Sequence, residues 1–217
     1  MKTIIFGASG MVGMGVLLEC LDDVRVNSVL VIGRSSCGVA HPKLTEILQG
    51  DFYNFESIQN RFADCDACFF CLGVSSAGKS ESEYHRLTYD LTMAAAKSLY
   101  AANPNMTFCY VSGEGTDSTE KGRMMWARVK GKTENTLLTL FKSAYMFRPG
   151  FIEPMRGVRP KVRLYKYLLI LFHPLFPIIR LFPHTTSVNI GRAMIQVAEI
   201  GDSQRILSAK DINRLAA

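Results

Sequence analysis

Three glycines near the start of the chain have the spacing of a phosphate-binding loop. Gly7, Gly10 and Gly13 follow the apolar, β-branched run TIIF, and apolar residues at helical spacing come after them. Glycines let the backbone turn sharply and approach a phosphate, and the free N–H groups of a helix's first turn face the anion. The pattern therefore predicts a loop for the pyrophosphate of a dinucleotide. An ordinary strand-to-helix turn is the alternative, because the spacing is GxxGxxG and not GxGxxG.

Arg34 follows the second apolar run, where dinucleotide folds place the residue that meets the adenosine ribose. A carboxylate at this point holds the free 2′-hydroxyl of NAD, whereas a guanidinium pairs with the 2′-phosphate of NADP. The stretch Gly33-Arg34-Ser35-Ser36 has no carboxylate, and its hydroxyls can add hydrogen bonds to phosphate. The sequence thus favours NADP over NAD, with a solvent-facing loop arginine as the alternative.

Two further strand ends carry candidate cofactor contacts. Asp51 can accept a hydrogen bond from an adenine amino group while the neighbouring Phe52 packs on the ring, although a turn aspartate is the alternative. Cys71 and Leu72 end a later apolar run, and Gly73 after them would let the backbone approach the ribose or pyrophosphate.

Strands and helices alternate along the first two thirds of the chain. This order argues for a parallel sheet covered on both faces, in other words a doubly wound α/β fold with a small helical C-terminal segment. The expected strands after the first are 27–35, 44–49, 66–72, 106–112, 144–148 and 204–209, and the expected helices are 55–62, 81–102, 119–141 and 187–200.

Residues 151–183 differ from the rest because they contain five prolines and the apolar run LYKYLLILFHPLFPIIRLF. Lys166, His173, Arg180 and the prolines interrupt this run, so a kinked hairpin of two short helices fits better than a membrane span. It could pack on the domain, form a contact between subunits of a homo-oligomer, or touch a membrane surface. We expect a single domain over 1–217, with 151–183 as a helical cap, substrate or interface segment.

Composition narrows the function classes. A chain of 217 residues with 48% hydrophobic and 20% charged residues suits a soluble globular domain. The net charge of +6 comes without a dense Lys/Arg run, which argues against nucleic-acid binding. The six cysteines have no second CxxC or His pair, so we expect buried thiols in a reducing compartment and no metal site. The residues after Lys2 already read as a strand, so we expect no signal peptide and a cytoplasmic location.

Taken together, these motifs resemble the short-chain dehydrogenase/reductase superfamily. GASGMVG, GRS, GDF, CLG, YVSGEGTD, the segment around Lys130 and FRPG occur in the family's order. The likeness covers about residues 1–150 and is greatest to the atypical and extended branches, which include NAD(P)-binding epimerase/dehydratase-like and Tat-interacting-oxidoreductase-like proteins. It implies a Rossmann fold with the cofactor at the carboxyl edge of the sheet and the substrate under C-terminal segments.

The motifs imply a set of cofactor-binding residues. These are Gly7, Ser9, Gly10, Met11, Val12, Gly13, Arg34, Ser35, Asp51, Phe52, Cys71, Leu72, Gly73, Lys130, Pro149 and Gly150.

The resemblance also implies a catalytic set, with one departure. In the family a serine positions the substrate oxygen, a tyrosine transfers the proton, and a lysine four residues later lowers the tyrosine's pKa and holds the nicotinamide ribose. Ser112 and Lys130 match the serine and the lysine, but Trp126 stands where the tyrosine is expected. An indole N–H is only a donor and cannot shuttle a proton near neutral pH.

Three accounts of Trp126 stay open. The chain could bind a dinucleotide without catalysis, a pocket water could donate the proton, or another acid among Tyr84, Tyr89, Tyr110 and Glu114 could replace the tyrosine. Ordinary helix packing of Trp126 and a surface position for Lys130 are the non-functional alternatives. The sequence therefore favours an NADP(H)-binding oxidoreductase of unknown small-molecule substrate, with a non-catalytic, dinucleotide-dependent binding protein as the alternative.

Overall fold

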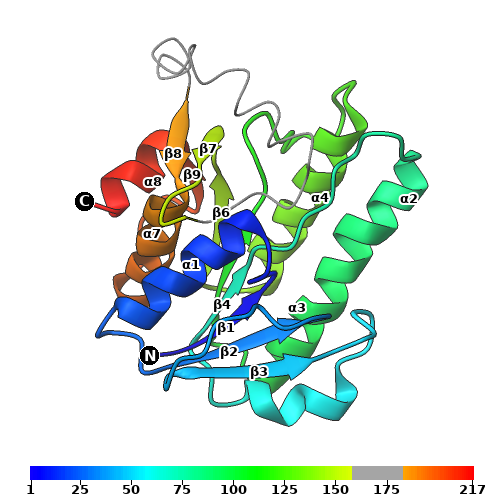
Figure 1. Cartoon of the computed structure of the whole chain (residues 1–217). Coiled ribbons are helices and arrows are strands. Elements are labelled where there is room, and N and C mark those ends of the chain that lie inside the picture. Colours follow the sequence, from blue (N-terminus) through cyan, green and yellow to red (C-terminus); the bar gives the residue numbers. More distant parts are fainter. Residues whose placement is uncertain (158–182) are drawn as a thin grey trace.

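Seven parallel strands form the central sheet of the protein (Figure 1). The computed structural model describes residues 1–157 and 183–217. The strand order β3-β2-β1-β4-β5-β6-β9 matches the Rossmann order, and every adjacent pair is parallel. The predicted doubly wound sheet is confirmed. Its strands are β1 (Lys2–Phe6), β2 (Ser28–Gly33), β3 (Leu44–Leu48), β4 (Ala67–Phe70), β5 (Thr107–Val111), β6 (Ala144–Arg148) and β9 (Ile206–Ser208).

Helices cover both faces of this sheet (Figure 1). Helices α1 (Met11–Asp22), α7 (Ser187–Ile200) and α8 (Ala209–Leu215) lie on one face. The 3-10 helix η1 (Glu56–Phe62) and the helices α3 (Leu91–Ala102) and α4 (Met125–Leu140) lie on the other. The helix expected at 81–102 is continuous, but it consists of α2 (Glu81–His85), a π-helical turn η2 (Arg86–Asp90) and α3.

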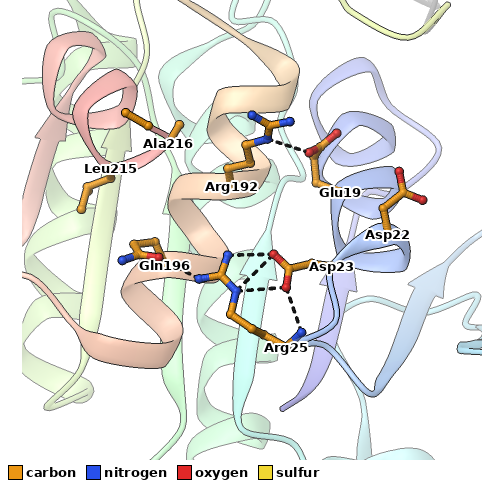
Figure 2. Close-up of a pocket in the computed structure, with 9 residues that line it drawn as sticks. Glu19, Asp22, Asp23, Arg25, Arg192, Gln196, Leu215 and Ala216 are labelled. Atoms are coloured by element: carbon orange, nitrogen blue, oxygen red, sulfur yellow. Dashed lines mark hydrogen bonds and ion pairs between the residues drawn. The ribbon is translucent and has the colours of Figure 1, made fainter.

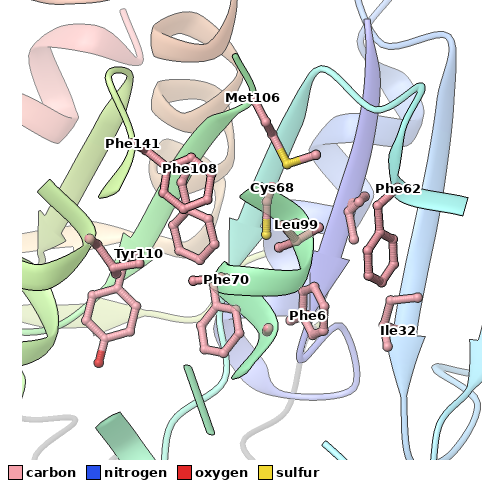
Figure 3. Packing of buried hydrophobic residues seen from close by; sticks show 14 of the residues in the cluster. Phe6, Ile32, Phe62, Cys68, Phe70, Leu99, Met106, Phe108, Tyr110 and Phe141 are labelled. Atoms are coloured by element: carbon pink, nitrogen blue, oxygen red, sulfur yellow. The ribbon is translucent and has the colours of Figure 1, made fainter. Parts of the chain in front are cut away.

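Alternation along the strands builds a separate core on each face. Phe6, Phe70 and Phe108 belong to the cluster that Figure 3 shows, on the face that η1, α3 and α4 cover. Ile5 and Phe69 pack on the opposite face, under α1 and α7. All four of these β1 and β4 side chains are at most 1% exposed. This two-sided burial explains why the strands read as continuous apolar runs and not as alternating ones.

The cysteines follow the same geometry. Cys68 packs in the core under α3 and α4, and Cys71 packs against the core under α1. All six cysteines are free thiols, and four of them are buried, which agrees with the expectation from their apolar context.

The helix expected at 119–141 was placed too early, because α4 begins only at Met125. The Asp117 carboxylate accepts hydrogen bonds from the Thr119 and Gly122 N–H groups at 3.0 and 2.6 Å, and Glu120 has a φ of 60°. These contacts hold 117–122 in a turn, so the helix cannot start there.

The region around 151–183 contains a small second sheet that the sequence did not suggest. Strands β7 (Phe151–Glu153) and β8 (His184–Thr186) pair in parallel, so part of the expected helical cap is strand. The helical hairpin expected between them falls on 158–182, which lies outside the described residues. Among the described helices, none combines the length and apolar character needed to cross a membrane.

Candidate functional site at the carboxyl edge of the sheet

The glycine loop brings the ends of β1 and β4 into contact. Gly7 has a φ of +84°, and a Cβ on it would lie 3.0 Å from the Cys71 carbonyl and the Leu72 nitrogen. A Cβ on Gly13 would lie 2.2 Å from the Gly7 carbonyl oxygen. Both positions therefore require glycine, one for its conformation and its close neighbours, the other for close helix–loop packing.

Gly10 is the open member of this loop. It is the N-cap of α1, and a Cβ there would have one neighbour within 4 Å, the Gly7 oxygen at 3.3 Å. The helix start has no side-chain cap and no acidic residue in its first turn. The loop Gly7–Gly13 thus presents the free N–H groups of the first turn of α1, next to a glycine that leaves room for a ligand. This arrangement fits the pyrophosphate of a dinucleotide.

At the end of β2, Arg34 is exposed, as a contact to a ribose phosphate would need. The loop after it is held by Glu46 of β3, whose two carboxylate oxygens accept from the Ser36 hydroxyl and the Cys37 N–H, both at 2.7 Å. Burial acts to raise the pKa of Glu46, but these bonds outweigh it and lower the pKa. Sequence reasoning missed Glu46 because only the pairing of β2 with β3 brings it to this loop.

The two residues expected to contact the adenine, Asp51 and Phe52, lie in a turn and in the hydrophobic core, respectively. Phe52 is 6% exposed and packs edge-on against Phe6 and Phe55, with ring centroids 6.2 and 5.8 Å away. The Asp51 carboxylate accepts from the Tyr53 N–H at 2.8 Å, which is the bond of a turn aspartate. Contact of these two residues with an adenine stays a prediction.

Ser112, Lys130 and Trp126 converge on one loop. The Lys130 Nζ donates to the Ser112 carbonyl oxygen, and Trp126 Cη2 lies 3.4 Å from the position of a Cβ on Gly115. Burial lowers the pKa of Lys130 to about 8, although nearby Glu134 acts to raise it. The Ser112 hydroxyl donates to the Phe147 carbonyl at 3.1 Å. Lys130 is therefore not a free surface lysine.

Two of the four candidate replacement acids are core residues. Tyr110 and Tyr84 are 1% and 2% exposed, and burial raises the pKa of each hydroxyl. Raised pKa values and enclosure make both tyrosines poor partners for a substrate from solution.

The other two candidates differ in position. Tyr89 lies against Lys132, whose ammonium is 4.7 Å from the centroid of the Tyr89 ring. Lys132 follows Lys130 by two residues on α4, so the two side chains point about 200° apart around the helix. Tyr89 is therefore on a different side of α4 from Lys130. Glu114 is exposed on the loop after Ser112, and its N–H donates to the Pro149 carbonyl at 3.1 Å. Glu114 is thus the candidate acid that the fold places beside the cluster.

The FRPG stretch borders the same loop. A Cβ on Gly150 would lie 2.0 Å from the Pro183 carbonyl oxygen, so this glycine permits a close backbone crossing. Together, Pro149 and Gly150 connect the Ser112 loop to the start of β8.

A buried ion pair that the sequence did not reveal lies next to Lys130. Glu134 is fully buried, and the Arg148 Nε donates to its two oxygens at 3.0 and 3.2 Å. The same guanidinium donates to the Ser118 hydroxyl at 2.6 Å. Arg148 therefore ties β6, α4 and the loop after Ser112 together.

A hollow of about 490 Å³ between α1, α7 and the chain end contains none of the predicted residues (Figure 2). Its charges satisfy one another: Arg192 donates to Glu19 at 3.0 Å, and Arg25 pairs with Asp23 at 2.7 Å. We assign it to helix packing. Among the described residues, no group of His, Cys, Asp and Glu could hold a metal ion.

Comparison with known proteins supports the motif likeness. No protein-family model matches the chain. The chain is 25% identical to Protein FMP52-1, mitochondrial, of Scheffersomyces stipitis, over 70% of this chain and 67% of that protein. It is 23% identical to Protein fmp52-2, mitochondrial, of Aspergillus oryzae, over 97% and 95%, and 27% identical to Protein HTATIP2 of Rattus norvegicus, over 68% and 61%.

Solved structures share the fold at low identity. MoeE5 in complex with UDP-glucose and NAD superposes with a TM-score of 0.69 at 16% identity, covering 98% of this chain and 79% of that one. A short chain dehydrogenase/reductase from Saccharomyces cerevisiae gives 0.66 at 15%, covering 99% and 98%. A variant of ElxO with NADPH bound gives 0.67 at 12%, covering 94% of each chain.

The cytoplasmic location expected from the sequence is wrong by this comparison, because two of these curated relatives are named mitochondrial proteins. The family likeness, in contrast, is confirmed: the chain has the fold of the NAD(P)-binding short-chain dehydrogenases/reductases and is similar in sequence to atypical members of that superfamily.

Proposed function

We propose that this protein binds NADP(H) and acts as an atypical oxidoreductase on a small-molecule substrate. The observation that carries the proposal is the convergence of Lys130 on the Ser112 carbonyl. This convergence lies at the same edge of the parallel sheet as the uncapped glycine loop. Carboxyl ends of parallel strands are where doubly wound folds bind their ligands.

The residues present would divide the work. The N–H groups behind Gly10 would hold the pyrophosphate, Arg34 would pair with the 2′-phosphate, and Lys130 would hold ribose hydroxyls. An ammonium has three donors, and the Ser112 carbonyl takes one of them, so others are available for hydroxyl oxygens. A bound nicotinamide dinucleotide would supply hydride chemistry. Glu114 is the side chain we assign to proton transfer, because it is exposed beside Ser112.

Calorimetric titration with NADPH and NADH tests the cofactor. We expect NADPH to bind about tenfold to a hundredfold more tightly, since a charge-assisted hydrogen bond contributes about 1.5–3 kcal/mol. The Arg34→Glu variant should lose this preference. Arg61→Glu is the matched control, because Arg61 is exposed near the opposite edge, before the start of β4. Equal affinities in the unaltered protein would contradict the proposal.

One observation favours a second function, a dinucleotide-dependent binding protein without catalysis. Trp126 stands in the sequence where the proton donor is expected, four residues before Lys130, and it packs against Gly115, while Tyr84 and Tyr110 are buried. NADPH oxidation on a broad panel of carbonyl compounds separates the two functions. Turnover that is lost in Glu114→Gln supports the oxidoreductase, and tight NADPH binding with no turnover on any compound supports the binding protein.

A further inference from the structure

Lys130 and Glu134 are four residues apart on α4, so their side chains share one face of the helix. A lysine and a glutamate at this spacing ordinarily pair with each other. Here the Lys130 ammonium instead donates to the Ser112 carbonyl, at the carboxyl end of β5. Some other group must therefore satisfy the Glu134 charge, because a buried carboxylate without a partner is strongly unfavourable.

Arg148 is that group. Its Nε approaches both Glu134 oxygens, at 3.0 and 3.2 Å, and its Nη2 bonds one of them as well. Glu134 is 0% exposed, and the pair is therefore screened little by water. Arg148, on β6, therefore binds the Glu134 carboxylate through two of its nitrogens, in a bidentate ion pair.

The other charged groups on this part of α4 point elsewhere. Arg128 donates to Glu81 at 2.7 Å, and Lys132 lies over the Tyr89 ring and 3.3 Å from the His85 Nε2. From β5, Tyr110 faces Glu134. Burial first, and then Tyr84 and Glu134, raise the pKa of its hydroxyl, so it carries no charge that could replace Arg148.

We propose that Arg148 and Glu134 are positioning residues for Lys130: Arg148 occupies the Glu134 carboxylate, and Lys130 consequently extends to the Ser112 loop instead of folding back along α4. The pair also bonds Ser118, so it positions the loop and the ammonium together. The importance of this arrangement for ligand binding rests on the function proposed above. The arrangement of Lys130, Glu134 and Arg148 does not depend on that function, because all of its contacts are between residues of the protein.

The lowered pKa of Lys130, about 8, agrees with an ammonium that is buried and only partly compensated by Glu134. Its titration is therefore the sensitive readout. We would label lysines with ¹³C at Cε, assign the Lys130 signal by its loss in Lys130→Met, and follow its shift with pH in the full chain without any dinucleotide.

The pair predicts shifts of opposite sign. Arg148→Gln frees a carboxylate one turn from Lys130 and should raise the midpoint by about 1–3 pH units. Glu134→Gln leaves an unpaired guanidinium nearby and should lower it. The double variant removes both charges and should return the midpoint close to that of the unaltered protein. Shifts of the same sign in both single variants, or none, would overturn the proposal and leave Arg148 as a structural brace.

Arg205→Gln is the matched control. Arg205 also links α4 to β6, through the Leu138, Phe141 and Ala144 carbonyls at 3.1, 2.8 and 3.1 Å, but at the far end of the helix. It should change stability and leave the Lys130 midpoint unchanged.

If the single variants fail to fold, two variants that keep the charges balanced, Arg148→Lys and the double variant Arg148→Gln with Glu134→Gln, can still test the proposal. Arg148→Lys and the double variant both leave no free carboxylate, so a raised midpoint in either would contradict the proposal. Because no dinucleotide is used, this result is independent of whether the protein binds NADPH.

Discussion

The glycine loop and the Lys130 cluster lie at the same edge of the sheet, but they are built in different ways. The loop is made by backbone, and its requirements are the lack of a Cβ at Gly7 and Gly13. The cluster is made by side chains, and its geometry depends on charges from α4 and β6 and on their bonds to the loop after β5. The glycine loop should therefore be disrupted by a Cβ at Gly7 or Gly13. The Lys130 cluster should instead be disrupted by the loss of one charge of the Arg148–Glu134 pair.

The largest effect is expected where the side-chain site departs from the short-chain dehydrogenase/reductase pattern that the chain resembles. If Trp126 occupies a vacated proton-donor position, Trp126→Tyr restores a hydroxyl within reach of Lys130. General-acid catalysis contributes about 10²- to 10⁴-fold, so carbonyl reductase turnover should rise by that order. Lys130→Ala in the same background should abolish the gain. If Trp126→Phe leaves turnover unaltered and Trp126→Tyr adds none, position 126 takes no part in proton transfer and the donor is Glu114, as assigned above.

The backbone site should fail by loss of stability. In Gly13→Ala the new Cβ would overlap the Gly7 carbonyl, at 2.2 Å, and α1 must move. We expect a loss of about 3 kcal/mol in the free energy of unfolding, measured by urea denaturation. Gly73→Ala is the control, because a Cβ there meets nothing within 4 Å. Equal stability of the two variants would show that the helix–loop packing is not as close as described.

Gly10 separates ligand binding from folding in the same loop. Gly10→Val adds a side chain with one tight contact, at 3.3 Å, so the variant should fold. It should lose the stabilisation by NADPH, which is about 2.7 kcal/mol at a hundredfold excess over Kd. Thermal melting with and without NADPH measures this. A variant that still gains the full stabilisation would show that the loop is a structural turn only.

The smallest effect concerns the pH dependence of the side-chain site. Because burial lowers the pKa of Lys130 to about 8, the unfolded chain binds the proton more tightly than the folded one. Lys130 therefore opposes folding below about pH 8, and this penalty disappears as pH rises toward the ordinary lysine value.

Unaltered protein should thus gain about 2.5 kcal/mol between about pH 8 and pH 10.5, relative to Lys130→Met. Subtracting the variant's curve removes the opposite trend from buried thiols, whose pKa values burial raises. Parallel curves from urea denaturation would show that the ammonium is solvated.

Prediction from the sequence succeeded where a rule is local. Continuous apolar runs identified the sheet, glycine spacing identified the loop, and both follow from backbone geometry within a few residues. It failed at the start of α4, because the Asp117 side chain competes with the helix for the N–H groups of the next residues.

The sequence by itself determined the order of the seven strands of the main sheet, the glycine positions and the presence of a tryptophan at position 126. Only the tertiary structure decided which charges meet. Glu134 and Arg148 are 14 residues apart, and Ser36 and Glu46 are 10 apart, on different elements in each case. Residue types at a fixed spacing predict the conformation of one segment, because that conformation depends on neighbours in the sequence. Contacts between segments depend on strand order and helix packing, which arise from the burial of the whole chain.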